Sequence, residues 1–197
     1  MSGLHDQPDE HATPLSPEER EGLIPAHITL RRELNEAEQQ NILKAVSWAF
    51  DRKRPLFTEG FAKGLHKRMY GEVWKWAGTY RTTGKNLGVD PYLIQTRLYE
   101  TMDQFKYWLA NNTFSNEELA VRFHHALVII HPFPNGNGRW SRMMADLLAH
   151  QLNVEPFTWG GDKSDLREDS AMRQAYIHAL QAADHHDFGP LLAFARI

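Results

Sequence analysis

The chain has 197 residues, of which 42% are hydrophobic, and it carries a formal net charge of −3 at pH 7. This length suits one well-filled core and is short for two, so we expect a single globular domain with an N-terminal tail. The weak negative charge gives no general attraction to nucleic acid or to anionic membranes, which argues against binding to either. The sequence contains no cysteine, which excludes disulfide bonds, thiolate zinc sites and thiol nucleophiles.

The N-terminal region is polar and lacks the basic and apolar segments of a signal peptide. No apolar run reaches membrane-spanning length, so we expect a cytoplasmic protein. Ser16 and Glu19 form a capping-box pattern around Pro17, which predicts a short helix. We assign residues 1–30 to a tail and short helix that can dock on the core, and residues 31–197 to the main domain.

Apolar residues recur at three- and four-residue steps through most of the chain, which predicts a mainly α fold of bundled helices. Asn35 followed by Glu38 predicts the start of the first long helix, and Ser115 followed by Glu118 predicts the start of a later one. The predicted long helices, in chain order, are 35–50, 61–70, 91–110, 115–131, 139–152 and 164–184, and a last short helix covers 189–197.

Residues 80–90 (YRTTGKNLGVD) break this helical pattern, because Gly84 and Gly88 bracket a short extended piece. The pattern predicts a small β-hairpin. An exposed strand edge can bind an extended peptide through its unpaired main-chain groups. The alternative is a turn with no role beyond structure.

The most informative stretch is residues 131–142 (HPFPNGNGRWSR). Pro132 disfavours helical geometry in the preceding residue, so the apolar helix before it should end at His131. Gly136 and Gly138 leave the backbone open to a ligand, and the first N–H groups of the next helix have no partner within that helix. The stretch therefore predicts an anion site suited to phosphate.

The other polar residues of this stretch fit the same interpretation. Arg139 and Arg142 are three residues apart on one helix face, where two guanidinium groups can bind the oxygens of a di- or triphosphate. Asn135 and Asn137 can bind a cation through oxygen or an oxyanion through nitrogen. His131 is the side chain that can exchange a proton near neutral pH. An ordinary turn would not require all of these residues together.

Two further histidines, His124 and His125, lie on the helix before the motif. We expect packed or exposed side chains here, because a metal site would need additional ligands at suitable positions.

The stretch resembles the signature of the Fic family (filamentation induced by cyclic AMP), His-x-Phe-x-Asp/Glu-Gly-Asn-Gly-Arg-x-x-Arg. Every fixed position matches except Asn135, which stands where the family usually has Asp or Glu. The wider chain is similar to the Fic subgroup called mobile mystery protein B. This likeness covers residues 12–15 (ATPL), 22–25 (GLIP) and 71–81 (GEVWKWAGTYR).

The resemblance implies a Fic-type helical bundle with a hairpin flap near the active site, and transfer of AMP from ATP to a Ser, Thr or Tyr hydroxyl of a target protein. It implies His131 as general base, with Arg139 and Arg142 neutralising phosphate charge. The nucleotide-binding set that it implies is Asn135, Gly136, Asn137, Gly138, Arg139 and Arg142. The flap residues that would bind the target are Gly84, Lys85, Asn86, Leu87 and Gly88.

Asn135 affects the implied cofactor. The family carboxylate at this position binds Mg²⁺, and an amide oxygen can coordinate the ion without supplying negative charge. We therefore expect weaker magnesium dependence or slower turnover than with an acidic residue. The two glycines at 136 and 138 favour nucleotide transfer, because the related Doc toxins, which phosphorylate their target, carry Ala and Lys at the matching positions.

Many Fic proteins are inhibited by a glutamate that binds the second arginine of the motif, here Arg142. The chain has no clean copy of the inhibitory pattern, and Glu10 is the preferred candidate. The weaker candidates are Glu21, Glu33 and Glu168.

Two other functions stay open. One is a Fic module that binds nucleotide or peptide with weak or no catalysis, because Asn135 replaces the acidic residue. The other is a toxin-like Fic enzyme that uses another nucleotide and is regulated by a separate small helix-turn-helix protein. The sequence does not decide the oligomeric state, and a homo-oligomer is among the options.

Overall fold

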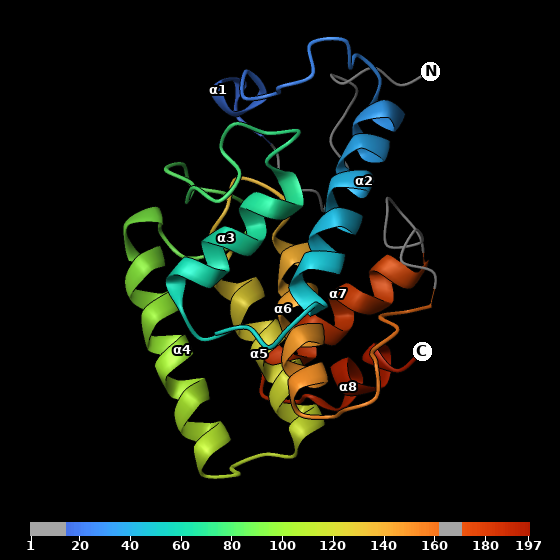
Figure 1. Cartoon of the computed structure of the whole chain (residues 1–197). Helices are drawn as coiled ribbons and strands as arrows, with labels where there is room; N and C mark the ends of the chain where they lie inside the picture. Colours follow the sequence, from blue (N-terminus) through green and yellow to red (C-terminus); the bar gives the residue numbers. More distant parts are fainter. Residues whose placement is uncertain (1–14, 162–170) are drawn as a thin grey trace.

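The computed structural model describes residues 15–161 and 171–197, and these residues form a mainly helical fold (Figure 1). They contain the helices α1 (Pro17–Arg20), α2 (Arg31–Phe50), α3 (Glu59–Tyr70), η1 (Pro91–Leu93, a 3₁₀ turn), α4 (Ile94–Ala110), α5 (Asn116–Ile130), α6 (Asn137–Gln151), α7 (Ala171–Asp184) and α8 (Gly189–Ala195). In the same residues there is no β-strand, and the one isolated β-bridge joins Leu23 to Trp74.

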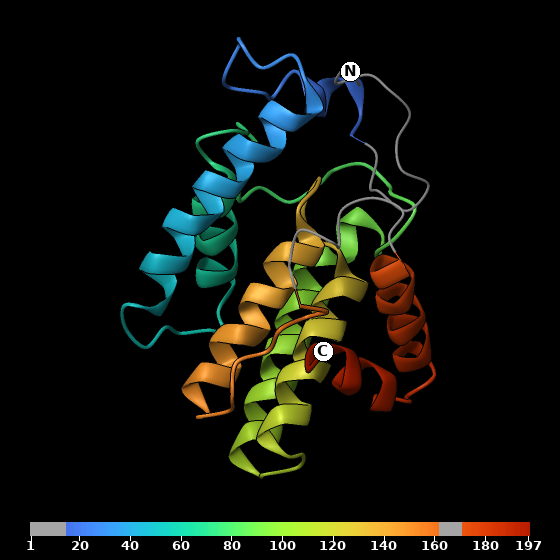
Figure 2. The ribbon, with the colours of Figure 1, turned by 90° about the vertical axis from the view of Figure 1, so that its right-hand side faces the viewer.

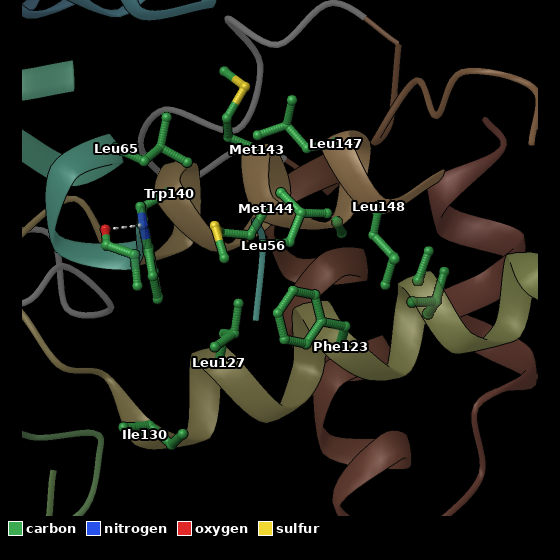
Figure 3. Packing of buried hydrophobic residues seen from close by; sticks show 14 of the residues in the cluster. Leu56, Leu65, Phe123, Leu127, Ile130, Trp140, Met143, Met144, Leu147 and Leu148 are labelled. Atoms are coloured by element: carbon green, nitrogen blue, oxygen red, sulfur yellow. Dashed lines mark hydrogen bonds between the residues drawn. The ribbon is translucent and has the colours of Figure 1, made fainter. Parts of the chain in front are cut away.

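The core is built around α5 and α6, which pack against each other along their length. Figure 2 shows this pair in the middle of the molecule, with α2 and α3 on one side and α7 and α8 on the other. Figure 3 shows the interface, where Phe123 and Leu127 of α5 meet Met144 and Leu148 of α6. Trp140 is fully buried, and its indole N–H donates to the Ala62 carbonyl of α3 at 3.1 Å. The motif therefore lies between the two most buried helices.

The apolar stripes predicted for α3, α4 and α6 are confirmed. In α4, for example, Ile94, Leu98, Met102 and Phe105 are all buried. The N-terminal caps at Ser16 and Ser115 are also confirmed, because both hydroxyl groups accept the predicted backbone N–H. The predicted helix start at Ser164 lies outside the described residues.

The prediction for α2 was partly wrong. The helix begins at Arg31, four residues before Asn35, because the Glu33 carboxylate accepts the N–H groups of Thr29 and Leu30 and caps the helix there. Its buried face carries Glu38, Asn41, Ala45 and Ala49, while Leu43 is exposed. Apolar spacing was only partly informative here, because small and polar side chains fill the fully buried positions while Ile42, Val46 and Trp48 pack against the core as partly buried side chains.

The segment that contains α1 docks on residues 73–76. The Ile24 N–H donates to the Val73 carbonyl, and the Lys75 N–H donates to the Gly22 carbonyl, each at 2.8 Å. The Trp76 indole N–H donates to the Glu19 carbonyl at 2.9 Å. The division at residue 30 stays a prediction, whereas this docking is a feature of the structure.

The predicted β-hairpin at residues 80–90 was wrong, because these residues form an irregular loop. The carbonyls of Thr83 and Val89, which a ladder of paired strands could use, accept hydrogen bonds from the Arg81 side chain. A cationic side chain thus takes the place of a partner strand. Among the described residues, no helix is long and apolar enough to cross a membrane.

Candidate active site

The motif begins where α5 ends. His131 adopts the left-handed conformation, with φ 50° and ψ 59°, and only 6% of its surface is exposed. Pro132 cannot continue the helix, so the chain turns sharply at this histidine. The sequence-based prediction that His131 lies at a helix end is confirmed.

Gly136 is required by geometry. Its φ of 77° is left-handed, and an added Cβ would lie 2.5 Å from Cζ of Tyr70. Gly138 differs, because a Cβ there would meet only Nη1 of Arg142, at 3.8 Å. Packing within the protein therefore requires a residue without a side chain at position 136, but it does not require one at position 138.

Asn137 holds the turn together. Its side chain is buried, its Oδ1 accepts the Phe133 N–H at 2.9 Å, and its Nδ2 donates to the Phe133 carbonyl at 2.8 Å. The amide therefore closes a small ring with the backbone four residues earlier. The side chain is bonded within the protein, and the nucleotide contact of Asn137 stays a prediction.

His66 of α3 contacts the turn at Phe133 and Asn135. Its Nδ1 accepts the Gly78 N–H at 3.0 Å, so its Nε2 carries the proton and donates to the Asn135 carbonyl at 3.0 Å. Its ring stacks on Phe133, with centroids 3.7 Å apart. Burial lowers the pKa of His66 to about 3, with a smaller opposing effect from the Asn135 backbone, so the ring is neutral at pH 7.

Asn135 supplies a poor metal site. Its Oδ1 accepts the Gly136 N–H at 2.6 Å, and it is uncharged. The described part of the chain contains no group of three His, Cys, Asp or Glu side chains that could hold a metal ion. Mg²⁺ in nucleotide sites is usually bound by one or two carboxylates and by substrate phosphates. The protein groups present here therefore do not fit a resident Mg²⁺.

The two arginines of the motif contact different partners. Arg139 Nη1 lies 2.7 Å from Oε2 of Glu38, a buried carboxylate of α2 whose other oxygen accepts the Trp74 indole N–H at 2.7 Å. Arg142 lies over the Tyr176 ring of α7, with its Cζ 5.4 Å from the ring centroid. The spacing predicted that the two guanidinium groups act together, but they contact different helices, Arg139 at α2 and Arg142 at α7.

The electrostatic environment keeps His131 neutral. Burial, with smaller contributions from the charges of Arg81 and Lys85, lowers its pKa to about 4, against a raising effect from the Val128 backbone. An imidazole with this pKa is deprotonated at pH 7 and can accept a proton.

The predicted flap residues have different surroundings in the structure. Gly88 lies against His131, since an added Cβ would be 2.6 Å from the His131 Cβ, while Leu87 is 47% exposed. Lys85 Nζ lies 2.5 Å from Oε2 of Glu19, which ties the loop to α1. Gly84 and Asn86 are exposed.

The other predicted groups have simpler surroundings. His124 and His125 are packed, with Nε2 of each 2.8 Å from the Tyr176 hydroxyl and from Asp184 Oδ1 respectively. Glu10 and Glu168 lie outside the described residues. Glu33 caps α2 and Glu21 is exposed, so their inhibitory role stays a prediction.

Sequence reasoning missed several residues that shape the site, namely Glu38, His66, Tyr70, Arg81 and Tyr176. Glu38 was interpreted as a capping residue, although it stands seven residues before Ala45, on the same helix face. The other four belong to elements whose contacts with the motif depend on the packing of the whole chain.

The geometry defines a class of protein: a helical domain with a neutral histidine at the end of one buried helix and a glycine-opened helix start shortly after it. Residues 56–149 match the Fic/DOC family. The chain is 29% identical over 134 residues to the protein adenylyltransferase Fic of Drosophila grimshawi, covering 66% of this chain and 26% of that protein. It is 31% identical over 100 residues to the protein adenylyltransferase fic-1 of Caenorhabditis elegans, covering 47% and 19%.

A solved structure shares the fold. The BepC protein of Bartonella tribocorum, with bound AMPPNP, matches with a TM-score of 0.66 over 91% of this chain and 96% of that chain, at 19% identity. Residues 56–149 of the chain therefore match the Fic/DOC family, and the chain shares the fold of a solved structure over most of its length. It spans about a quarter or less of the length of the curated relatives named above. The narrower likeness to mobile mystery protein B stays a prediction.

The buried histidines should make stability depend on pH. An unfolded histidine takes a proton near pH 6.5, whereas folded His66 does so only near pH 3, so the unfolded state binds more protons in between. Stability should therefore fall as the pH is lowered from 6.5 toward 4, and His66 alone should account for about 1–3 kcal/mol at pH 4.5. Urea unfolding at pH 7.5, 6.0 and 4.5 measures this loss.

The matched variants are His66→Gln, which retains a donor toward Asn135, and His178→Gln on the exposed face of α7. His66→Gln should show a smaller loss of stability between pH 7.5 and 4.5 than wild type, while His178→Gln should follow wild type. An unchanged loss in His66→Gln would contradict the assigned burial of a neutral ring.

Proposed function

We propose that this chain is a protein adenylyltransferase that moves AMP from ATP to a Ser, Thr or Tyr hydroxyl of a target protein. The observation that carries the proposal is the neutral His131 directly before the turn that opens α6. The relatives named protein adenylyltransferase support the same reaction. The match with a structure that holds AMPPNP supports ATP as the nucleotide.

In the proposed reaction, the target hydroxyl oxygen attacks the α-phosphorus of ATP while His131 takes the hydroxyl proton. The bond between the α-phosphorus and the bridging oxygen breaks, and its electron pair leaves with pyrophosphate. The products are the AMP-modified protein, pyrophosphate and a protonated His131 that returns its proton to water. Because the pKa of His131 is lowered to about 4, the free imidazole is available at neutral pH.

The start of α6 would hold the phosphates. Its first backbone N–H groups have no acceptor within the helix and lie at the positive end of the helix dipole. Gly136 allows the left-handed entry into the helix, and Gly138 adds no side chain beside it. Arg139 and Arg142 would approach the phosphate charge from two sides, as their different partners indicate.

The loop at residues 80–90 is the proposed binding site for the target segment. Its end at Gly88 lies against His131, and its neighbours Asn86 and Leu87 are exposed. A target chain that contacts this loop would bring its hydroxyl close to the base. The finer proposals are action in the cytoplasm, which the absence of cysteine and of a signal-peptide pattern favours, and control by a small helix-turn-helix protein, which the resemblance to mobile mystery protein B implies. Mg²⁺ would enter with the phosphates of ATP, and no step above requires it.

The first test is transfer of label from α-phosphate-labelled ATP to protein in a cell lysate. Wild type should label a target, and His131→Ala should reduce the rate by about two to four powers of ten, the usual contribution of a positioned base. At pH 5.5 an imidazole of pKa about 4 is almost fully deprotonated, whereas one of ordinary pKa 6.5 is only about one-tenth deprotonated. Labelling should therefore remain nearly constant from pH 7.5 to 5.5.

Circular dichroism at each pH is the control for folding. Equal labelling by wild type and His131→Ala would reject His131 as the base. An absence of label from ATP would favour the nucleotide- or peptide-binding module, or a toxin-like enzyme that uses another nucleotide.

Asn135→Asp tests the metal position. An aspartate can accept the same Gly136 N–H, so the turn is retained while a negative ligand is added. The labelling rate should rise, and half-maximal rate should occur at lower Mg²⁺. Asn112→Asp, which adds the same charge between α4 and α5, should leave both unchanged. A fall in rate, or no change, for Asn135→Asp would count against a role of position 135 at the metal.

Glu38→Gln tests whether the Glu38 carboxylate competes with phosphate for Arg139. An ion pair with a partly exposed partner is worth up to about 1 kcal/mol, which corresponds to at most about a fivefold fall in KM for ATP when it is removed. Glu72→Gln, at an exposed ion pair with Lys44, is the matched control. A higher KM for Glu38→Gln would show instead that Glu38 orients Arg139 for binding.

A further inference from the structure

The end of α5 presents three consecutive carbonyls, and all three accept hydrogen bonds from the loop at residues 80–90. The Val89 N–H donates to the Ile130 carbonyl at 3.4 Å, Arg81 Nε donates to the His131 carbonyl at 2.7 Å, and the Arg81 N–H donates to the Pro132 carbonyl at 3.0 Å. Carbonyls at a helix end have no partner inside the helix, so the loop satisfies groups that the turn at His131 leaves open.

One side chain joins these parts. Besides His131, the Arg81 guanidinium donates through Nη1 to the Thr83 carbonyl at 3.0 Å and through Nη2 to the Val89 carbonyl. Arg81 is 3% exposed, and its bond to the His131 carbonyl is buried. The planar guanidinium has donors in a fixed fork, and here it bonds both ends of the loop and the histidine backbone at once.

Gly88 makes this close packing possible. Its φ is 110°, and an added Cβ would lie 2.6 Å from Arg81 Nη2 and 2.6 Å from the His131 Cβ. The loop backbone thus passes directly over the base and its anchoring arginine. A side chain at position 88 would push the three groups apart.

The charge of Arg81 also acts on the site. Arg81 and Lys85 are the charged groups that lower the pKa of His131, whereas Asp90 and Glu19 are the acidic groups that act on Arg81. Lys85 is paired with Glu19 of α1. The guanidinium donates to the uncharged carbonyls of His131 and Thr83, and an arginine is protonated at neutral pH, so its positive charge lies beside the histidine.

We propose that Arg81 is a positioning residue for the transfer reaction, which fastens the loop at residues 80–90 to the His131 backbone and holds the histidine in its left-handed conformation. The proposal rests on the proposed role of His131 as the base. Arg81 acts through His131 and the loop, and contacts neither nucleotide nor target itself. Lysine has the charge but lacks a planar fork that can reach three carbonyls, so it should replace only part of this role.

The test combines two variants, Arg81→Gln and Arg81→Lys, with Arg97→Gln on the exposed face of α4 as control. NMR of histidine-labelled protein, with His131 assigned from its loss in His131→Ala, measures the His131 titration and the backbone carbon shifts that report its φ and ψ. This readout needs no activity. Labelling from ATP against pH is measured in parallel, and circular dichroism gives the folded fraction.

Both Arg81 variants should shift the backbone carbon resonances of His131 and lower the labelling rate by about ten- to a hundredfold, the usual result of a small misplacement. The titration midpoint of His131 should rise by about one pH unit in Arg81→Gln, where the charge is lost, and should stay near wild type in Arg81→Lys. Arg97→Gln should match wild type in every measurement.

The proposal is overturned if both folded Arg81 variants keep the wild-type His131 backbone shifts and midpoint, or if labelling falls only in proportion to the folded fraction. If wild type itself transfers no label, the proposed function fails. In that case the backbone carbon shifts of His131 still decide whether Arg81 positions His131.

Discussion

The structure depends on one constraint: the chain must leave a buried helix and enter another within the six residues 131–136. Both α5 and α6 bury most of their surface, so neither can shift to relax the turn. The turn is therefore made with a left-handed histidine at one end and a left-handed glycine at the other. The same geometry that reverses the chain exposes a helix start beside the histidine, which makes the fold and the candidate site one feature.

A turn this tight leaves backbone groups without helical partners, and buried polar side chains supply them. Asn137 bonds both backbone groups of Phe133, His66 donates to the Asn135 carbonyl, and Arg81 bonds the His131 carbonyl. Each group is itself buried, so each would destabilise the protein if its partner moved. The three side chains come from α6, α3 and the loop at residues 80–90, so the geometry of the turn depends on the packing of all three elements.

The sequence was informative where a local rule determines the structure. Pro132 determines where α5 ends, and the capping serines determine two helix starts, so these features were predicted correctly. The hairpin prediction failed because glycine spacing does not reveal that Arg81 bonds the carbonyls which a ladder would need. Glu38 was missed because its ion pair with Arg139 joins residues 101 positions apart. Contacts of this kind arise from the packing of whole helices, which no local pattern records.

The arrangement of the two arginines follows from the same packing. Residues three apart on α6 share a face, yet α2 lies beside one and α7 beside the other, so each meets a different neighbour. Glu38 offers Arg139 a buried carboxylate, whereas Tyr176 offers Arg142 the face of a ring. A phosphate group at the start of α6 would compete with a full charge for the first arginine and with a weaker cation–π contact for the second. Under the proposed function, Arg142 would therefore turn to a phosphate at lower cost than Arg139, which would first have to leave Glu38.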